Sequence, residues 1–160
     1  MKWISDKKKR EIIEELLLQN YNKYYRLAYS YVHNDSEAGD IVQNGAYRAI
    51  LYSHKLKNIE YAETWLYRIM MNEIFANYRE KETVSIDEVT YEKGKEDTYE
   101  NVDLQKAINT LDKKDRAVVV LRYYEDMKLE EIAMILEENL STVKSRLYRS
   151  MKKLRLELEE

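Results

Sequence analysis

The sequence predicts an all-α protein with two small helical domains joined by an acidic flexible linker. Pro is absent and Gly occurs only at positions 39, 45 and 94, so the two strongest helix breakers are almost missing. Residues 83–103 carry seven acidic and two basic residues and lack helical apolar spacing, whereas the charge of the flanking segments is nearly balanced. We therefore expect domains at 1–82 and 104–160, with the linker at 83–103.

The composition limits the classes of protein that the chain can belong to. A chain of 160 residues with 44% hydrophobic content can form real cores. Cysteine is absent, which excludes disulfides, thiolate metal sites and a cysteine nucleophile, and which fits a reducing, cytoplasmic setting. No segment approaches the roughly 20 apolar residues that span a bilayer, so we expect neither export nor membrane insertion.

Helical spacing of apolar residues predicts the first three helices. Apolar residues between 12 and 17 mark one helix, and residues 21–32 mark a second, whose tyrosines we interpret as core and rim residues. Residues 33–35 are predicted to form a turn. Ser36 then caps a third helix, in which apolar residues recur without a gap from Ala38 to Ile50.

The opposite side of the third helix mixes charged, amide and apolar groups. Such a mixture is typical of a protein contact, although a merely solvated face is an equally good interpretation of these residues alone. The side chains on this face are Asp40, Gln43, Asn44, Tyr47, Arg48 and Leu51.

A polar connector, residues 52–63, precedes a fourth helix that is predicted to begin at Thr64 and to bury Trp65, Leu66, Ile69 and Met70. Basic and amide side chains are left for its surface, with Tyr67 and Tyr78 nearby. Cations interleaved with aromatic rings suit a single strand, because bases stack on rings while phosphates meet cations. The candidates for this contact are His54, Lys57, Asn58, Arg68, Asn72 and Arg79.

The C-terminal segment predicts a helix-turn-helix. Its first helix has an apolar face at Leu129, Ile132, Ala133 and Leu136. Ser141 is the expected N-cap of the second helix, whose apolar stripe is Val143, Leu147, Met151 and Leu154. Between residues 141 and 155 there are six cations and no acidic residue. A solvated helix would mix signs to form ion pairs, so this pattern favours contact with DNA.

In a helix-turn-helix the second helix lies in the major groove, with its N-terminal residues near base edges and flanking cations on phosphates. Arg146 or Arg149 could pair with a guanine through two nitrogens. The residues alone leave open which side chains touch bases and which touch phosphates. The candidates are Ser141, Thr142, Lys144, Ser145, Arg146, Arg149 and Lys152.

Three motifs occur together in one order: DIVQ at 40–43, WLYRI at 65–69 and TVKSRLYR at 142–149. In this combination the chain resembles, over residues 15–157, the extracytoplasmic-function sigma factors of bacterial RNA polymerase, and among them a Gram-positive, stress-responsive subgroup. The resemblance implies a region 2 bundle at 1–82 and a region 4 helix-turn-helix at 104–160.

The resemblance also implies partners. The region 2 domain would bind the clamp coiled coil of core RNA polymerase through Asp40, Gln43, Asn44, Tyr47 and Arg48, and would read the melted −10 promoter element with the connector and the fourth helix. The region 4 domain would read the −35 element as duplex and touch the polymerase flap through residues 112–124. An anti-sigma factor is a further implied partner, and the free protein is expected to be a monomer.

The chain departs from the family pattern at the predicted turn and in the third helix. Members often have Gly where Glu137 stands and Pro near Asn139, so the turn is expected to follow a different path. Gly39 replaces a common acidic residue, which removes one expected carboxylate contact to the polymerase.

Other functions find less support in the residues. His33 and His54 lie in no metal-ligand spacing and no Gly-rich phosphate loop is present, so we expect no enzyme, no cofactor and no metal. A dimeric helix-turn-helix regulator that acts without polymerase is the main alternative, and oligomeric state would distinguish it. A helical interaction protein without a DNA role is a third interpretation.

Overall fold

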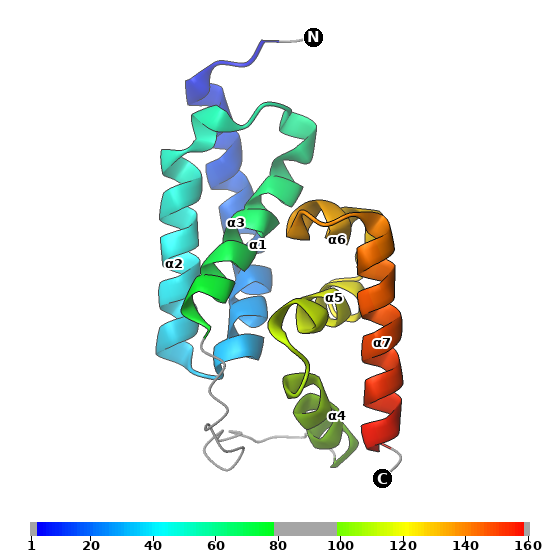
Figure 1. Ribbon diagram of the computed structural model, residues 1–160. Helices are drawn as coiled ribbons and strands as arrows, with labels where there is room; N and C mark the ends of the chain where they lie inside the picture. Colours follow the sequence, from blue (N-terminus) through cyan, green and yellow to red (C-terminus); the bar gives the residue numbers. More distant parts are fainter. Residues whose placement is uncertain (1–2, 79–98, 159–160) are drawn as a thin grey trace. The chain divides into compact units, whose positions relative to one another are not determined.

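The computed structural model describes residues 3–78 and 99–158, and within these ranges every regular element is helical (Figure 1). The all-α prediction is therefore confirmed. The chain separates into two compact units, one formed mainly by the residues up to Arg79 and the other mainly by the rest of the chain. Most of the predicted linker lies outside the described residues, but a helix begins at Tyr99, so residues 99–103 of that segment are helical.

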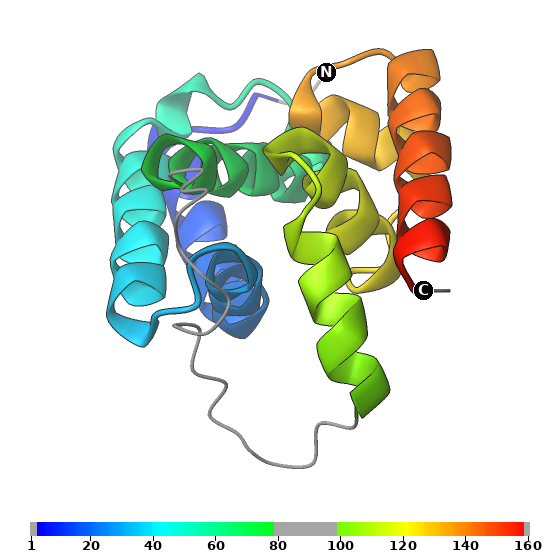
Figure 2. The same ribbon diagram turned by 60° about the horizontal axis from the view of Figure 1, so that its bottom comes forward.

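The N-terminal unit is a bundle of three helices: α1 (Asp6–Val32), α2 (Asp35–Leu51) and α3 (Ala62–Asn77). Each helix packs against the other two, and α1 and α2 run side by side in opposite directions (Figures 1 and 2). Two short 3₁₀ turns, η1 (Ser53–Lys55) and η2 (Ile59–Tyr61), form the connection between α2 and α3.

A single long helix, α1, replaces the two that the sequence predicted at its start. Ser5 caps it by accepting a hydrogen bond from the Lys8 N–H, and it ends at His33, which adopts the left-handed conformation (φ 52°). The division into two helices was wrong because residues 18–20 include neither Gly nor Pro, and two of them, Leu18 and Gln19, are good helix formers, so they do not stop a helix.

The starts of α2 and α3 also differ from the prediction. Asn34, not Ser36, caps α2, with its side chain accepting a hydrogen bond from the Glu37 N–H at 2.8 Å. The fourth predicted helix, α3, begins at Ala62, two residues before Thr64. The preceding turn η2 leads directly into it, so no side-chain cap is needed to mark the start.

The core of this unit forms where α1, α2 and α3 meet. Tyr24 is fully buried and meets Tyr67 edge to face, with ring centres 5.1 Å apart. Tyr67 was predicted near the surface and is 7% exposed, while Trp65 and Ile69, predicted as buried, are only partly buried. The α3 helix is therefore rotated relative to the predicted arrangement, with Leu66, Met70 and Ile74 at the centre of the core.

The C-terminal unit contains α4 (Tyr99–Asn109), α5 (Lys113–Tyr123), α6 (Leu129–Leu136) and α7 (Leu140–Leu158). The α4 and α5 helices both pack against α7. The apolar faces predicted for α6 and α7 are directed inward, with the most complete burial at Ile132, Val143 and Leu154. The predicted helix-turn-helix is thus present as α6, a three-residue turn at 137–139, and α7.

Candidate nucleic-acid and polymerase interfaces

The turn between α6 and α7 is built without Gly or Pro. Glu137 ends α6 in the left-handed conformation, at φ 57°, a position that usually favours Gly. Asn139 caps α7, since its side-chain oxygen accepts a hydrogen bond from the Thr142 N–H at 2.9 Å. Ser141, which the sequence indicated as the cap, instead donates its hydroxyl to Asn139. The prediction of Ser141 as N-cap was wrong because α7 begins at Leu140.

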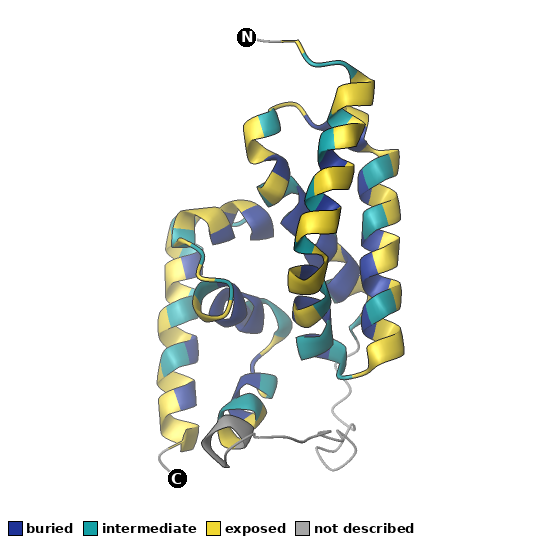
Figure 3. Ribbon diagram, turned by 180° about the vertical axis from the view of Figure 1, so that it is seen from behind, coloured by how far each residue is buried: buried dark blue, intermediate teal, exposed yellow. Residues whose placement is uncertain are grey.

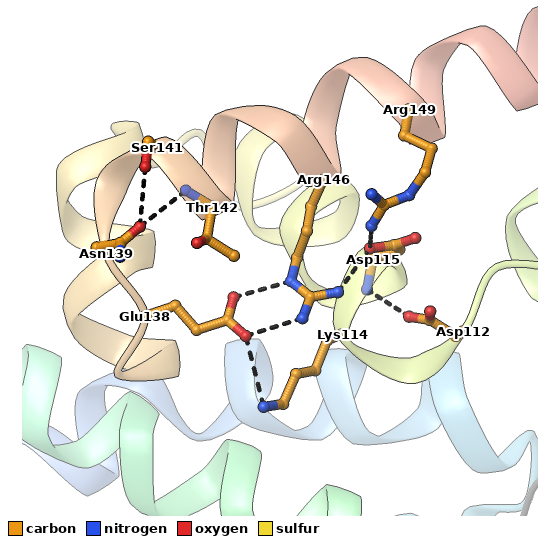
Figure 4. A network of polar contacts seen from close by, with 9 residues as sticks. All are labelled: Asp112, Lys114, Asp115, Glu138, Asn139, Ser141, Thr142, Arg146 and Arg149. Carbon is orange, nitrogen blue, oxygen red and sulfur yellow. Dashed lines mark hydrogen bonds and ion pairs between the residues drawn. The ribbon is translucent and has the colours of Figure 1, made fainter.

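A network of ion pairs fastens this turn to α5 (Figure 4). Arg146 donates from Nε and Nη2 to the two carboxylate oxygens of Glu138, at 2.8 and 2.9 Å, and from Nη1 to Asp115 at 2.9 Å. Asp115 also accepts a hydrogen bond from Arg149 at 3.0 Å, and Lys114 lies 3.5 Å from Glu138. The network therefore joins α5, the turn and α7.

Electrostatics within the network favour the charged forms. The hydrogen bonds from Arg146 hold the pKa of Glu138 below its usual range, against the opposing effect of burial. The same hydrogen bonds raise the pKa of the Arg146 guanidinium above its usual range. Both groups thus remain ionised, and the network is a set of charge-assisted hydrogen bonds of the strong type.

The DNA-reading candidates of α7 fall into two groups by exposure. Arg146 is mostly buried, with 19% of its side chain exposed, and Thr142 is partly buried. Tyr148, which the sequence reasoning did not select, is 78% exposed. Tyr148 follows Ser145 by three residues and Lys144 by four, so it lies on the same helix face as these candidates, and this spacing could have identified it as a DNA contact. The exposed candidates are Ser141, Lys144, Ser145, Arg149 and Lys152.

The connector between α2 and α3 brings further candidates to the surface. His54, Lys57 and Asn58 are all exposed, and the Asn58 side chain also caps η2. Asn72 is exposed on α3, Arg68 is partly buried, and Arg79 lies outside the described residues. Two exposed rings that were not selected, Tyr52 and Tyr61, flank the same connector, and the Lys55 Nζ lies 4.9 Å from the centre of the Tyr52 ring.

All the residues predicted for the polymerase contact are exposed on α2. Figure 3 shows the exposed residues of this helix in yellow and its buried residues in dark blue. Tyr47 is 67% exposed. Arg48 pairs with Glu73 of α3, with Nε and Oε2 2.6 Å apart. The remaining members of this face are Asp40, Gln43, Asn44 and Leu51.

Two searches within the described ranges bear on other kinds of site. No three of their His, Asp and Glu side chains are grouped so that they could hold a metal ion. None of their helices combines the length and the hydropathy that crossing a bilayer requires.

Comparison with protein families matches both units. Residues 16–83 match region 2 of sigma-70, and residues 101–154 match region 4 of sigma-70. The RNA polymerase sigma factor SigV of Bacillus subtilis is 38% identical to this chain, and the match covers 94% of the chain and 96% of SigV. The ECF RNA polymerase sigma factor SigW of the same organism is 32% identical, with 87% and 84% covered.

Solved structures show the same fold. The sigma factor RpoE from Bartonella quintana, crystallised with the anti-sigma factor NepR, matches with a TM-score of 0.72 at 23% identity and covers 91% of this chain and 96% of its own. CnrH, solved with the cytosolic domain of CnrY, matches with a TM-score of 0.70 at 20% identity and covers 92% and 87%. The chain belongs to the extracytoplasmic-function (ECF) family of RNA polymerase sigma factors, which are initiation factors and not enzymes.

Proposed function

We propose that the exposed face of α7 reads the −35 promoter element as duplex DNA when the protein is bound to core RNA polymerase. The observation that carries this proposal is the uniform character of that face, where Lys144, Ser145, Tyr148 and Lys152 are exposed at helical spacing and no acidic side chain interrupts them. Hydroxyl and cationic groups recognise base edges and phosphates, and an exposed ring can contact a thymine methyl group.

The −10 element is the proposed ligand of the connector and α3. Exposed rings at Tyr52 and Tyr61 provide surfaces on which unstacked bases can stack, and exposed cations at Lys55 and Lys57 suit the backbone of a single strand. Asn58 serves a structural purpose as the cap of η2, so its amide N–H₂ is the part left for a base. The candidates His54, Arg68, Asn72 and Arg79 retain the roles that the resemblance implies.

The exposed face of α2 is the proposed contact with the polymerase clamp. Tyr47 has the properties of an interface anchor, because it is a large amphipathic side chain that is exposed in the free protein. Asp40, Gln43 and Asn44 supply polar groups around it. Arg48 is tied to Glu73, and its remaining guanidinium nitrogens are available for a carboxylate on the partner.

The charge distribution explains why DNA reading would depend on polymerase. Nonspecific affinity for DNA increases with the number of phosphates that cations neutralise. On α7, Arg146 and Arg149 already pair with the carboxylates of Glu138 and Asp115, and the whole chain carries a net charge of −3. We propose that the free protein binds promoters weakly and therefore needs polymerase to read them. We further propose that it acts in the cytoplasm in a stress response and that an anti-sigma factor holds it inactive.

Variants of the two faces test this assignment. Fluorescently labelled protein is titrated with Bacillus subtilis core RNA polymerase, which is the natural choice because SigV of that organism is similar to this chain. Y47A is expected to weaken core binding by at least tenfold, as a hot-spot aromatic does. K144A is the matched control from the other unit and should bind core as the wild type does. Equal binding by Y47A and the wild type would remove α2 from the polymerase interface.

A further inference from the structure

We propose that Arg146 is a positioning residue of the DNA-reading helix: it fixes the α6–α7 turn against α5 so that its neighbours on α7 meet the −35 element in register. The inference rests on the proposed function of α7 and deepens it. It also assigns to Arg146 a role different from the guanine contact that the sequence suggested.

Every nitrogen of the guanidinium already binds a carboxylate, with three of its five N–H groups engaged, so the side chain can present its Nε edge to a base only by turning away from these carboxylates. A guanine is read by two guanidinium nitrogens that point the same way. All three nitrogens of Arg146 are already within 2.9 Å of carboxylate oxygens, two of them on Glu138 and one on Asp115. Such a turn would leave two carboxylates that are 14% and 9% exposed without the contacts of Arg146, which is costly for a poorly hydrated charge.

The turn needs a stabilising contact of this kind, because its residues do not by themselves favour the backbone conformation that it adopts. A Gly at the end of α6 would adopt the left-handed conformation without strain, whereas Glu137 does so at a cost of roughly 1 kcal/mol. Glu138, the next residue, is the one that Arg146 holds by both carboxylate oxygens. The ion pair thus acts on the backbone immediately after the strained residue.

The far end of the network is anchored in the core of the C-terminal unit. Asp115 is buried in the first turn of α5, and its backbone N–H is held by the Asp112 side chain at 2.9 Å. Arg146 therefore connects the α6–α7 turn to the buried first turn of α5. Any change in the turn would rotate or shift the start of α7, where Lys144 and Ser145 are exposed.

Arg149 provides the internal contrast. It binds the same Asp115 oxygen at 3.0 Å, but its side chain is 60% exposed and only one of its nitrogens is engaged. Turning Arg149 outward costs less than turning Arg146, because Arg149 is exposed and Asp115 keeps its ion pair with Arg146. Arg149 therefore remains a candidate reader, and it is the matched control for Arg146.

The test selects promoters with reconstituted holoenzyme. Bacillus subtilis core polymerase and the full chain transcribe a randomised promoter library, and sequencing of the transcripts gives the base preference at each position. R146K keeps the positive charge but loses the pair of guanidinium nitrogens that bind Glu138. E138Q removes the carboxylate that this pair of nitrogens binds. For both variants we expect the preference to fall by about tenfold across the whole −35 element, the size of one mismatch, while the −10 preference is retained. R149K should alter only one or two neighbouring base pairs.

The unchanged −10 preference shows that the N-terminal unit and the holoenzyme are intact, and a thermal melt of each variant shows whether the C-terminal unit is still folded at the temperature of the assay; a variant whose −35 preference falls only where its C-terminal unit has melted counts against the inference. Two further results would overturn the inference. One is a change confined to a single base pair in R146K. The other is a gain of −35-dependent transcription in E138Q, which is the outcome if Glu138 merely competes with DNA for Arg146. If the wild type selects no motif at all, the proposed function fails and the inference fails with it.

Discussion

At the scale of single residues, two arginines selected from the sequence as partner contacts also bind carboxylates of their own chain. Arg48 pairs with Glu73 across two helices, and Arg146 pairs with Glu138 and Asp115. Exposed ion pairs contribute about 0–1 kcal/mol, whereas a mostly buried pair costs several kcal/mol when one partner is removed. Glu73 is 11% exposed, so by this measure neither arginine leaves its carboxylate cheaply, and Arg48, which is 60% exposed, can reach a partner with the nitrogens that Glu73 does not bind.

The Glu138 carboxyl predicts a dependence of stability on pH. Its pKa in the folded protein lies below the ordinary value of 4.5, so its contribution to stability is fully present above pH 4.5 and is lost as the pH falls through the lower folded pKa. Urea unfolding followed by circular dichroism between pH 7 and pH 3 should show a steeper decline for the wild type than for E138Q. Parallel curves for the two proteins would show that the pair does not stabilise the fold.

At the scale of elements, helix ends and helix contacts depend on single side chains. The α7 helix begins with Asn139 as its cap, and α2 meets α3 through Gly45. A Cβ atom built on Gly45 would lie 2.5 Å from Sδ of Met70, closer than any real contact, whereas one on Gly39 would meet nothing within 4 Å. These differences give two pairs of matched variants.

The cap of α7 is tested by N139A against S141A. N139A removes the acceptor of the Thr142 N–H and should lower the free energy of unfolding by about 1 kcal/mol. S141A removes only a side-chain hydrogen bond on the surface and should cost a few tenths of that amount. Urea denaturation measures both. A larger loss of unfolding free energy in S141A than in N139A would show that Ser141 is the cap.

The contact between α2 and α3 is tested by G45A against G39A. G45A forces the flexible end of the buried Met70 side chain to move, and because Ala also gains helix propensity here, the net loss of stability of the N-terminal unit should be at most about 1 kcal/mol. G39A should stabilise it by roughly 0.5–1 kcal/mol, because Ala has the higher helix propensity. The fluorescence of Trp65 on α3 reports the unfolding of this unit. Equal effects of the two substitutions would contradict the close approach at Gly45.

Helix positions followed well from the sequence, but helix ends did not. Apolar spacing located α2, α3, α6 and α7, since burial of one face dominates the choice of structure. The caps at Asn34 and Asn139 were missed because Asn and Ser stand close together there, and both residue types are good caps. The network around Arg146 could not be predicted, because its partner Asp115 lies 31 positions away in the chain.

At the scale of the whole molecule, one chain carries a region 2 unit and a region 4 unit. The identities of 38% to SigV and 32% to SigW, together with the region 2 and region 4 matches, show the family, and the order of the three sequence motifs was enough to suggest it. Which residues contact polymerase and which contact DNA remains a prediction, because contact depends on partners that the sequence does not describe. The predicted boundaries of the domains and linker also stay predictions.

Oligomeric state separates the account from the alternative of a free-standing dimeric regulator. A sigma factor reads two different elements with two different units of one chain, so the purified protein should have the mass of a single chain in light scattering. A regulator that binds a palindrome should be a dimer, because each subunit contributes one recognition helix. A concentration-independent dimer would contradict the account.

Run-off transcription tests the central claim most directly. Bacillus subtilis core RNA polymerase is incubated with a genomic promoter library, with and without this protein, and the transcripts are sequenced. The account predicts new transcripts that start at a fixed distance below a shared motif with two separated parts, corresponding to the −10 and −35 elements. No new transcripts from core enzyme of verified activity, or new transcripts without a shared bipartite motif, would contradict it.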